Sequence, residues 1–146
     1  MRYSIKDVAA QIGLSAYTLR YYDKAGLLPF VARDAAGYRS FTDGDLQLLH
    51  TIICLKNTGM TIADIRRYVD AVMAGPKSIP VRKALLTQHR ARVVARQHQL
   101  ATNLREVDYK LSLYAAPDAP AKVEQELAAA HADKAANGLP DPFPIR

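Results

Sequence analysis

The feature that most restricts the fold is the stretch from Val81 to Ala116, which contains neither glycine nor proline. From Val93 onward, apolar or seam-compatible residues recur at alternating steps of four and three, the heptad pattern of a coiled coil. Such a helix is about 50 Å long at about 1.5 Å per residue, too long to pack only on its own small domain. The sequence therefore predicts a partner helix, along a seam of Leu86, Val93, Gln97, Leu100, Leu104, Val107, Leu111 and Tyr114.

Capping and stop signals divide the first part of the chain into short helices. Ser4 can cap a first helix with Asp7 as its capping-box partner, and Gly13 can end it in a left-handed conformation. Ser15 can cap a second helix that ends at Gly26. Two short helices joined by a glycine turn are typical of a helix-turn-helix.

The next segment is punctuated by Pro29 and Gly37 and changes to strand-like composition. Residues 30–31 and 38–41 flank a turn at residues 34–37, so we expect a small β-hairpin, or wing.

Two more helices should follow the wing. Thr42 or Asp43 can cap the third, and Thr61 can cap the fourth with Asp64 as its box partner. Gly75-Pro76 closes the unit. We therefore expect a DNA-binding head over residues 1–75 and a dimerisation helix over residues 76–116.

The remaining residues, 117–146, contain five of the eight prolines, so a second compact domain is not expected. An alanine-rich helix can form over residues 122–137, after Pro117 and Pro120 and before Gly138. The final LPDPFPIR should be an extended tail.

Charge is unevenly distributed along the chain. The formal charge is +3 over residues 1–80, +5 over 81–114 and −2 over 115–146, for a net +6. A basic body with an acidic tail is typical of a protein that binds a polyanion such as nucleic acid. A solvated helix surface over 81–114 would explain the second block equally well.

No apolar run is long enough to span a membrane, and the start MRYSIKDV lacks the apolar core of a signal peptide. The single cysteine cannot form an internal disulfide. The sequence therefore predicts a reduced, cytoplasmic setting.

Several motifs in order resemble the DNA-binding domain of MerR-family transcription regulators. They are TLRYYDKAGLL from Thr18, then Arg33, GYRSF from Gly37, DLQLL from Asp45 and TGMTIADI from Thr58. The resemblance is dense over residues 3–75, and the order of elements matches over residues 1–114. One departure is Phe30-Val31, where relatives usually carry a proline, so the first wing strand could differ in shape.

The resemblance implies a mainly α fold: a winged helix-turn-helix head of four short helices and a small β wing, then a long antiparallel coiled-coil helix. It implies a homodimer on double-stranded promoter DNA that bends and untwists the DNA so that RNA polymerase can use it. It implies neither an enzyme nor a cofactor, and the charged and nucleophilic residues form no recognisable catalytic set.

Residues suited to DNA lie on the second helix and the wing. Arg20 can bind phosphate or a guanine edge, and arginine and tyrosine on a wing can clamp the backbone. Leu19 and Tyr22 are expected in the core. The predicted DNA-binding set is Tyr17, Thr18, Arg20, Tyr21, Arg33, Tyr38 and Arg39, with Arg66 and Arg67 as weaker candidates for flanking phosphates.

The segment after the long helix argues against two kinds of effector site, a metal site and a drug-binding domain. The loop AAPDAPAK holds no cysteine or histidine, which argues against a thiolate metal site. Only 32 residues come after Tyr114, too few to enclose a drug-sized pocket.

Cys54 is then the candidate sensor, because CLKNTGM resembles the NmlR/AdhR branch, which responds to aldehydes and other thiol-reactive stress. His50, four residues earlier, shares its helix face and could favour the thiolate. The helix dipole opposes an anion in this C-terminal half, and a lone cysteine between apolar residues is most often inert.

Three interpretations remain open on the sequence. The first is a regulator switched by modification of Cys54. The second is a regulator controlled through its C-terminal tail by a small ligand or a protein partner. The third is an architectural DNA-bending protein without an effector.

Overall fold

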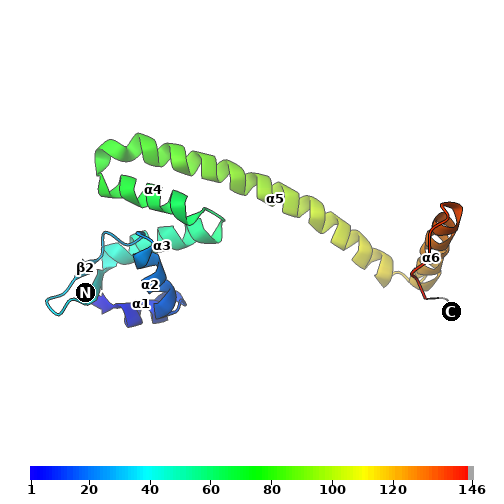
Figure 1. Cartoon of the computed structure of the whole chain (residues 1–146), viewed down its shortest axis with the longest axis horizontal. Coiled ribbons are helices and arrows are strands. Elements are labelled where there is room, and N and C mark those ends of the chain that lie inside the picture. Colours follow the sequence, from blue (N-terminus) through cyan, green and yellow to red (C-terminus); the bar gives the residue numbers. More distant parts are fainter. Residues whose placement is uncertain (145–146) are drawn as a thin grey trace. The chain divides into compact units, whose positions relative to one another are not determined.

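The computed structural model describes residues 1–144 and shows a mainly α chain with one small sheet (Figure 1). The chain forms two compact units, Met1–Arg96 and the residues from Gln97 onward. The predicted fold class, a winged helix-turn-helix head followed by a long helix, is confirmed. The elements of the first unit are β1 (Arg2–Ser4), α1 (Ile5–Ile12), α2 (Ala16–Lys24), β2 (Ala32–Arg33), β3 (Arg39–Thr42), α3 (Asp43–Asn57), α4 (Ile62–Met73), the 3-10 turn η1 (Pro76–Ser78) and the first part of α5 (Ile79–Ala115).

The helix starts follow the predicted N-caps, but the capping box predicted for α4 is only half formed: the Thr61 hydroxyl accepts from Asp64 N–H, while the Asp64 carboxylate pairs with Arg67. Ser4 and Asp7 form a reciprocal capping box at α1, and the Ser15 hydroxyl accepts from the backbone N–H of Thr18 at α2. Thr42, rather than Asp43, caps α3. Its box partner is Asp45, which sequence reasoning did not assign.

The wing differs from its predicted form. The sheet has the antiparallel order β1-β3-β2, with Tyr3 opposite Phe41 and Arg33 opposite Arg39. The predicted strand at residues 30–31 is wrong, because the N–H of Val31 bonds to Leu28 O in a turn and the strand begins at Ala32. Strand β1 was not predicted, since three residues are too few to show an alternating pattern.

The core of the first unit lies between this sheet and the helices α1 to α4. Leu19 and Tyr22 are buried, as predicted, so α2 is fixed by one face. Burial raises the pKa of the Tyr22 hydroxyl above its ordinary value, with a smaller contribution from Tyr21. The fully buried side chains are Phe41, Leu19, Leu27, Leu28, Leu49, Ile52, Ile65, Val8 and Val69.

The long helix α5 has 37 residues, which confirms the uninterrupted helix expected from the sequence. In the second unit α6 (Ala119–Ala136) begins three residues before the predicted start at 122, with Pro120 in its first turn. Proline is tolerated there because the first helical N–H groups have no partner within the helix.

The tail lies against α6 as far as it is described. Phe143 meets the His131 ring edge-on at 5.9 Å between centroids, and Lys134 lies over the Phe143 ring. A hydrogen bond from His131 holds the pKa of the Asp141 carboxyl below its ordinary value. The last two tail residues, Ile145 and Arg146, lie outside the described part. Among residues 1–144, no helix is both long and apolar enough to cross a membrane.

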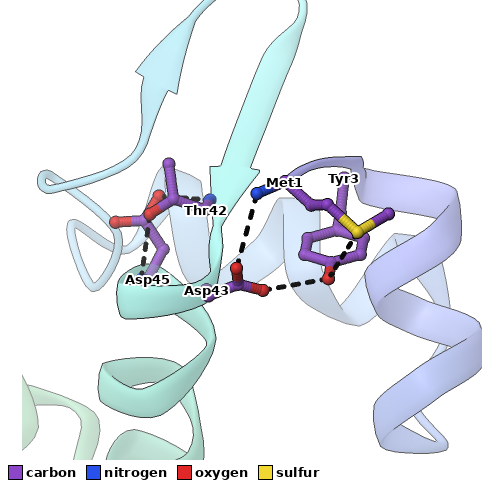
Figure 2. A network of polar contacts seen from close by, with 5 residues as sticks. All are labelled: Met1, Tyr3, Thr42, Asp43 and Asp45. Carbon is purple, nitrogen blue, oxygen red and sulfur yellow. Dashed lines mark hydrogen bonds and ion pairs between the residues drawn. The ribbon is translucent and has the colours of Figure 1, made fainter.

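A polar network ties the start of the chain to the first turn of α3 (Figure 2). The Tyr3 hydroxyl donates to Asp43 Oδ1 at 2.9 Å, and the Met1 amine lies 3.4 Å from Asp43 Oδ2. The Tyr3 bond, aided by the positive amine, holds the pKa of the Asp43 carboxyl below its ordinary value. The ionised carboxylate is therefore the form that fits the folded state.

The lowered pKa has a defined sign for stability. Because it is depressed in the folded state, the stabilisation by Asp43 is present above its unfolded-state pKa and is lost as pH falls through its folded-state pKa. We predict that Tyr3→Phe moves the Asp43 pKa upward, measured by carboxyl-carbon NMR titration. Tyr38→Phe removes an exposed wing hydroxyl and is the matched control. An unchanged Asp43 pKa in Tyr3→Phe would contradict the network.

Candidate nucleic-acid interface and thiol site

Helix α2 separates a core face from a solvent face. Leu19 and Tyr22 point into the core, whereas Tyr17, 80% exposed, Arg20 and Tyr21 lie on the outside. The predicted residue Thr18 is half-buried, and its hydroxyl lies 2.9 Å from the Ser15 hydroxyl at the helix start. Aromatic rings, hydroxyls and a guanidinium are therefore presented on one exposed helix face.

A cleft of about 430 Å³ lies between α2 and the wing. It brings together four of the predicted residues, Arg20 from α2 and Arg33, Tyr38 and Arg39 from the wing. Ser4, Ile5, Asp23, Lys24 and Gly37 complete its lining. Four cationic side chains against one carboxylate make this a surface that attracts an anionic backbone.

Within the cleft, the two wing arginines differ. Arg39 is held by Asp23, with Nε 2.9 Å from Oδ2, and its Nη1 donates to Val31 O, so only 20% of the side chain is exposed. Arg33 donates to Gly37 O at 2.7 Å, has Nη2 4.0 Å from Asp23 Oδ2 in a looser pair, and remains 56% exposed. Arg39 thus joins the wing to α2, while Arg33 is available on the surface.

Lys24 is a site residue that sequence reasoning missed. It lines the cleft and also a second hollow on α2 with Tyr17, Arg20 and Tyr21. The signal was present in its spacing, since Lys24 follows Arg20 by four residues and so lies on the same helix face.

The two arginines of α4 lie outside this cleft. The Arg66 side chain packs on the turn after α2, where Nε would lie 3.1 Å from a Cβ built at Gly26. That contact and the φ of +81° explain why glycine stands there. Arg67 is exposed and pairs with Asp64 at 3.5 Å. The structure does not bring these two residues together with the α2 set.

Cys54 is an exposed residue of α3 with a free thiol. Its Sγ lies 3.7 Å from Nε2 of His50, so the predicted pair on one helix face is formed. Over residues 1–144, no group of three or more histidine, cysteine or acidic residues is placed to hold a metal ion.

Comparison with known proteins gives a consistent set of relatives. Residues 3–72 match the model of the MerR helix-turn-helix regulatory family, and residues 46–110 match the MerR DNA-binding model. A helix-turn-helix transcriptional regulator of Haemophilus influenzae is 45% identical over 114 residues, which is 78% of this chain and 84% of that protein. The regulator AdhR of Bacillus subtilis is 35% identical over 91 residues, 62% of this chain and 65% of AdhR.

A solved structure agrees with these relatives. HiNmlR, described as a MerR family regulator lacking the sensor domain and bound to promoter DNA, superposes with a TM-score of 0.73 at 45% identity. The match covers 78% of this chain and 90% of that one.

Proposed function

This chain belongs to the MerR family of helix-turn-helix transcription regulators, and from that premise we propose that it distorts promoter DNA as a homodimer and is switched by modification of Cys54. The observation that carries DNA binding is the basic cleft between α2 and the wing. The similar regulator HiNmlR is described as bound to promoter DNA, which supports the same ligand here. In this proposal binding changes the geometry of the promoter so that RNA polymerase can use it, and the protein catalyses no reaction.

In this proposal α2 enters the major groove and the wing lies along the backbone. Tyr17, Thr18 and Arg20 face the groove, and Arg20 with Lys24 provides two cations one turn apart. Tyr21, Arg33 and Tyr38 bind phosphates, while Arg39 acts mainly by holding the wing. Arg66 and Arg67 lie outside the cleft and are assigned to flanking phosphates.

Homodimerisation is supported by the apolar stripe of α5. Leu100, Leu104, Val107 and Leu111 are each more than half exposed within the chain, as is Tyr114. An isolated helix gains nothing from exposing large apolar side chains at heptad spacing, whereas a second copy would bury them. Leu86 and Val93, earlier in the predicted seam, are only half-exposed, and Leu86 packs against the core. We therefore place the dimer helix within the predicted range 76–116, between the head (1–75) and the tail (117–146).

Disrupting the stripe should separate the dimer. Leu104→Glu places a charge in the seam, and we expect the particle mass measured by sedimentation equilibrium to fall toward that of the 16.1 kDa chain. Thr102→Glu, an exposed position off the seam, should leave the dimer intact. A dimer that persists in Leu104→Glu would rule out this stripe as the interface.

DNA binding should depend on Arg20 and on salt. Each phosphate contact contributes a slope of about −0.9 to the dependence of log affinity on log salt. On DNA selected by the protein from a random pool, Arg20→Ala should cost about 1–3 kcal/mol by fluorescence anisotropy. Lys77→Ala removes the same charge away from the cleft and serves as control. Equal affinities for the two variants would refute the assignment of Arg20.

The switch is assigned to Cys54 because it is the single thiol of the chain, it is exposed, and an imidazole nitrogen lies 3.7 Å from its sulfur. The imidazole can accept the thiol proton or stabilise the thiolate, which is the nucleophile toward an aldehyde. Similarity to the regulator AdhR and to HiNmlR, a MerR family regulator, supports this branch.

Replacing the thiol should abolish the response. We predict that transcription from a bound promoter rises with formaldehyde or methylglyoxal in wild type and stays at its basal level in Cys54→Ser. His50→Ala should respond more weakly, because it keeps the thiol without its neighbour. Equal induction in wild type and Cys54→Ser would exclude thiol sensing.

A second candidate is control through the C-terminal tail. It is favoured by an open hollow of about 590 Å³ in the second unit, lined by Tyr109, Leu113 and Lys122 among others. Truncation after Tyr114 separates the candidates, since only tail control predicts that regulation is lost. If both the full chain and the truncated protein bind DNA and neither responds to any added compound, an architectural role fits instead.

A further inference from the structure

A buried histidine joins α5 to the end of α3. His89 is only 6% exposed although it belongs to the largely exposed helix α5. Its Nε2 lies 2.7 Å from the hydroxyl of Thr58, the residue that caps the C-terminus of α3. Its Nδ1 is buried and has no hydrogen-bond partner among residues 1–144. Burying a polar ring with one nitrogen unpaired is costly, and the contact with Thr58 is the hydrogen bond that the described residues offer the ring in return.

The surroundings of Thr58 determine which atom donates. Its hydroxyl lies 2.7 Å from Cys54 O and 3.2 Å from Leu55 O, and carbonyl oxygens only accept. The single hydroxyl proton is therefore directed to these carbonyls, and His89 Nε2–H must donate to the hydroxyl. In this tautomer the buried Nδ1 is a bare acceptor, which is tolerated better than a buried N–H without a partner.

A second residue of α5 contacts the turn after α3. Arg96, seven residues after His89, lies with Nη1 3.4 Å from Thr58 O. A Cβ built on Gly59 would lie 2.2 Å from that Nη1, so the glycine leaves room for the arginine. His89 and Arg96, two turns apart on α5, therefore both contact Thr58 at the end of α3.

The geometry points to His89 as a positioning residue for the regulator. We propose that the chain Cys54 O, Thr58 Oγ1, His89 Nε2 transmits a change at Cys54 to α5. Cys54 lies in the last turn of α3, and its own carbonyl accepts from both the N–H and the hydroxyl of Thr58. An adduct that tilts this turn displaces the hydroxyl, and with it the bond to His89. This inference rests on the proposed sensing by Cys54 and adds the route from sulfur to dimer helix.

The link can be measured without DNA. In protein labelled with ¹⁵N-histidine, the four histidines give distinct ring-nitrogen signals, assigned by single substitutions. Full alkylation of Cys54 with iodoacetamide should shift the signals of His50, beside the sulfur, and of His89. Exposed His98 should not move. The unmodified protein should show His89 protonated on Nε2 alone. An unmoved His89 signal after complete alkylation would overturn the proposal.

Variants then test the function of the link. His89→Gln places an amide N–H near the Nε2 position and should keep induction by formaldehyde. His89→Leu and Thr58→Val remove opposite ends of the bond. We expect the DNA affinity of each variant to lie within about threefold of wild type, which is less than the tenfold change that corresponds to about 1.4 kcal/mol. Each should nevertheless lose induction by formaldehyde.

The two failures can be told apart. Wild-type protein that binds DNA but shows no Cys54-dependent induction would contradict the proposed sensing, and the alkylation experiment would still decide the link. Normal induction in Thr58→Val would contradict the link while leaving the sensing intact. If His89→Leu does not fold, as judged by thermal unfolding, Thr58→Val and Thr58→Ser carry the test. Thr58→Ser retains the hydroxyl and should behave as wild type.

Discussion

The ion pair between Asp23 and Arg39 fixes the geometry on which the DNA-binding surface depends. Asp23 lies on α2 and Arg39 on β3, and both side chains are about one-fifth exposed. Because Arg39 also donates to Val31 O, one guanidinium joins the helix, the turn before the wing and the central strand. Loss of Asp23 would leave the partly buried Arg39 guanidinium without its carboxylate, which is more costly than the pair is favourable. The cleft is therefore a fixed feature of the fold rather than a chance arrangement of long side chains.

Much of the first unit could be predicted because its signals are local. Ser4, Ser15, Thr42 and Thr61 each accept from a backbone N–H at a helix start, as N-cap residues do within one turn. The long helix could be predicted for the same reason, because the absence of glycine and proline and the heptad pattern are both properties of consecutive residues. Strand β1 pairs with β3 about 40 residues along the chain, so no local pattern identifies it. The start of β2 was missed for another reason, because the N–H of Val31 is taken up by a turn to Leu28 O and the two-residue strand is too short to show an alternation.

The sequence identified most residues of the candidate site, but it did not show which of them are exposed and which are bound to other side chains. Spacing placed Tyr17, Arg20 and Tyr21 on the exposed side of α2 and His50 beside Cys54, and the structure has both arrangements. Spacing could not show that Arg39 is engaged by Asp23 while Arg33 stays exposed, because the contact joins residues 16 apart. Burial of His89 was equally inaccessible, since its cause is the position of Thr58, 31 residues earlier. The roles proposed for these residues on DNA remain predictions.

Helix α3 carries core residues on one face and the proposed sensor on the other. Leu49, Ile52 and Leu55 recur every three residues and are buried, which fixes one face of the helix in the core. His50 and Cys54, four residues apart, lie on its exposed side. A modification can therefore add volume at the sulfur without entering the core. The ladder of backbone bonds ends in the last turn, where the Thr58 hydroxyl lies against the carbonyls of Cys54 and Leu55. That turn leads directly into Thr58, so the exposed thiol and the contact with α5 lie within four residues of each other, which is the spacing on which the proposed coupling rests.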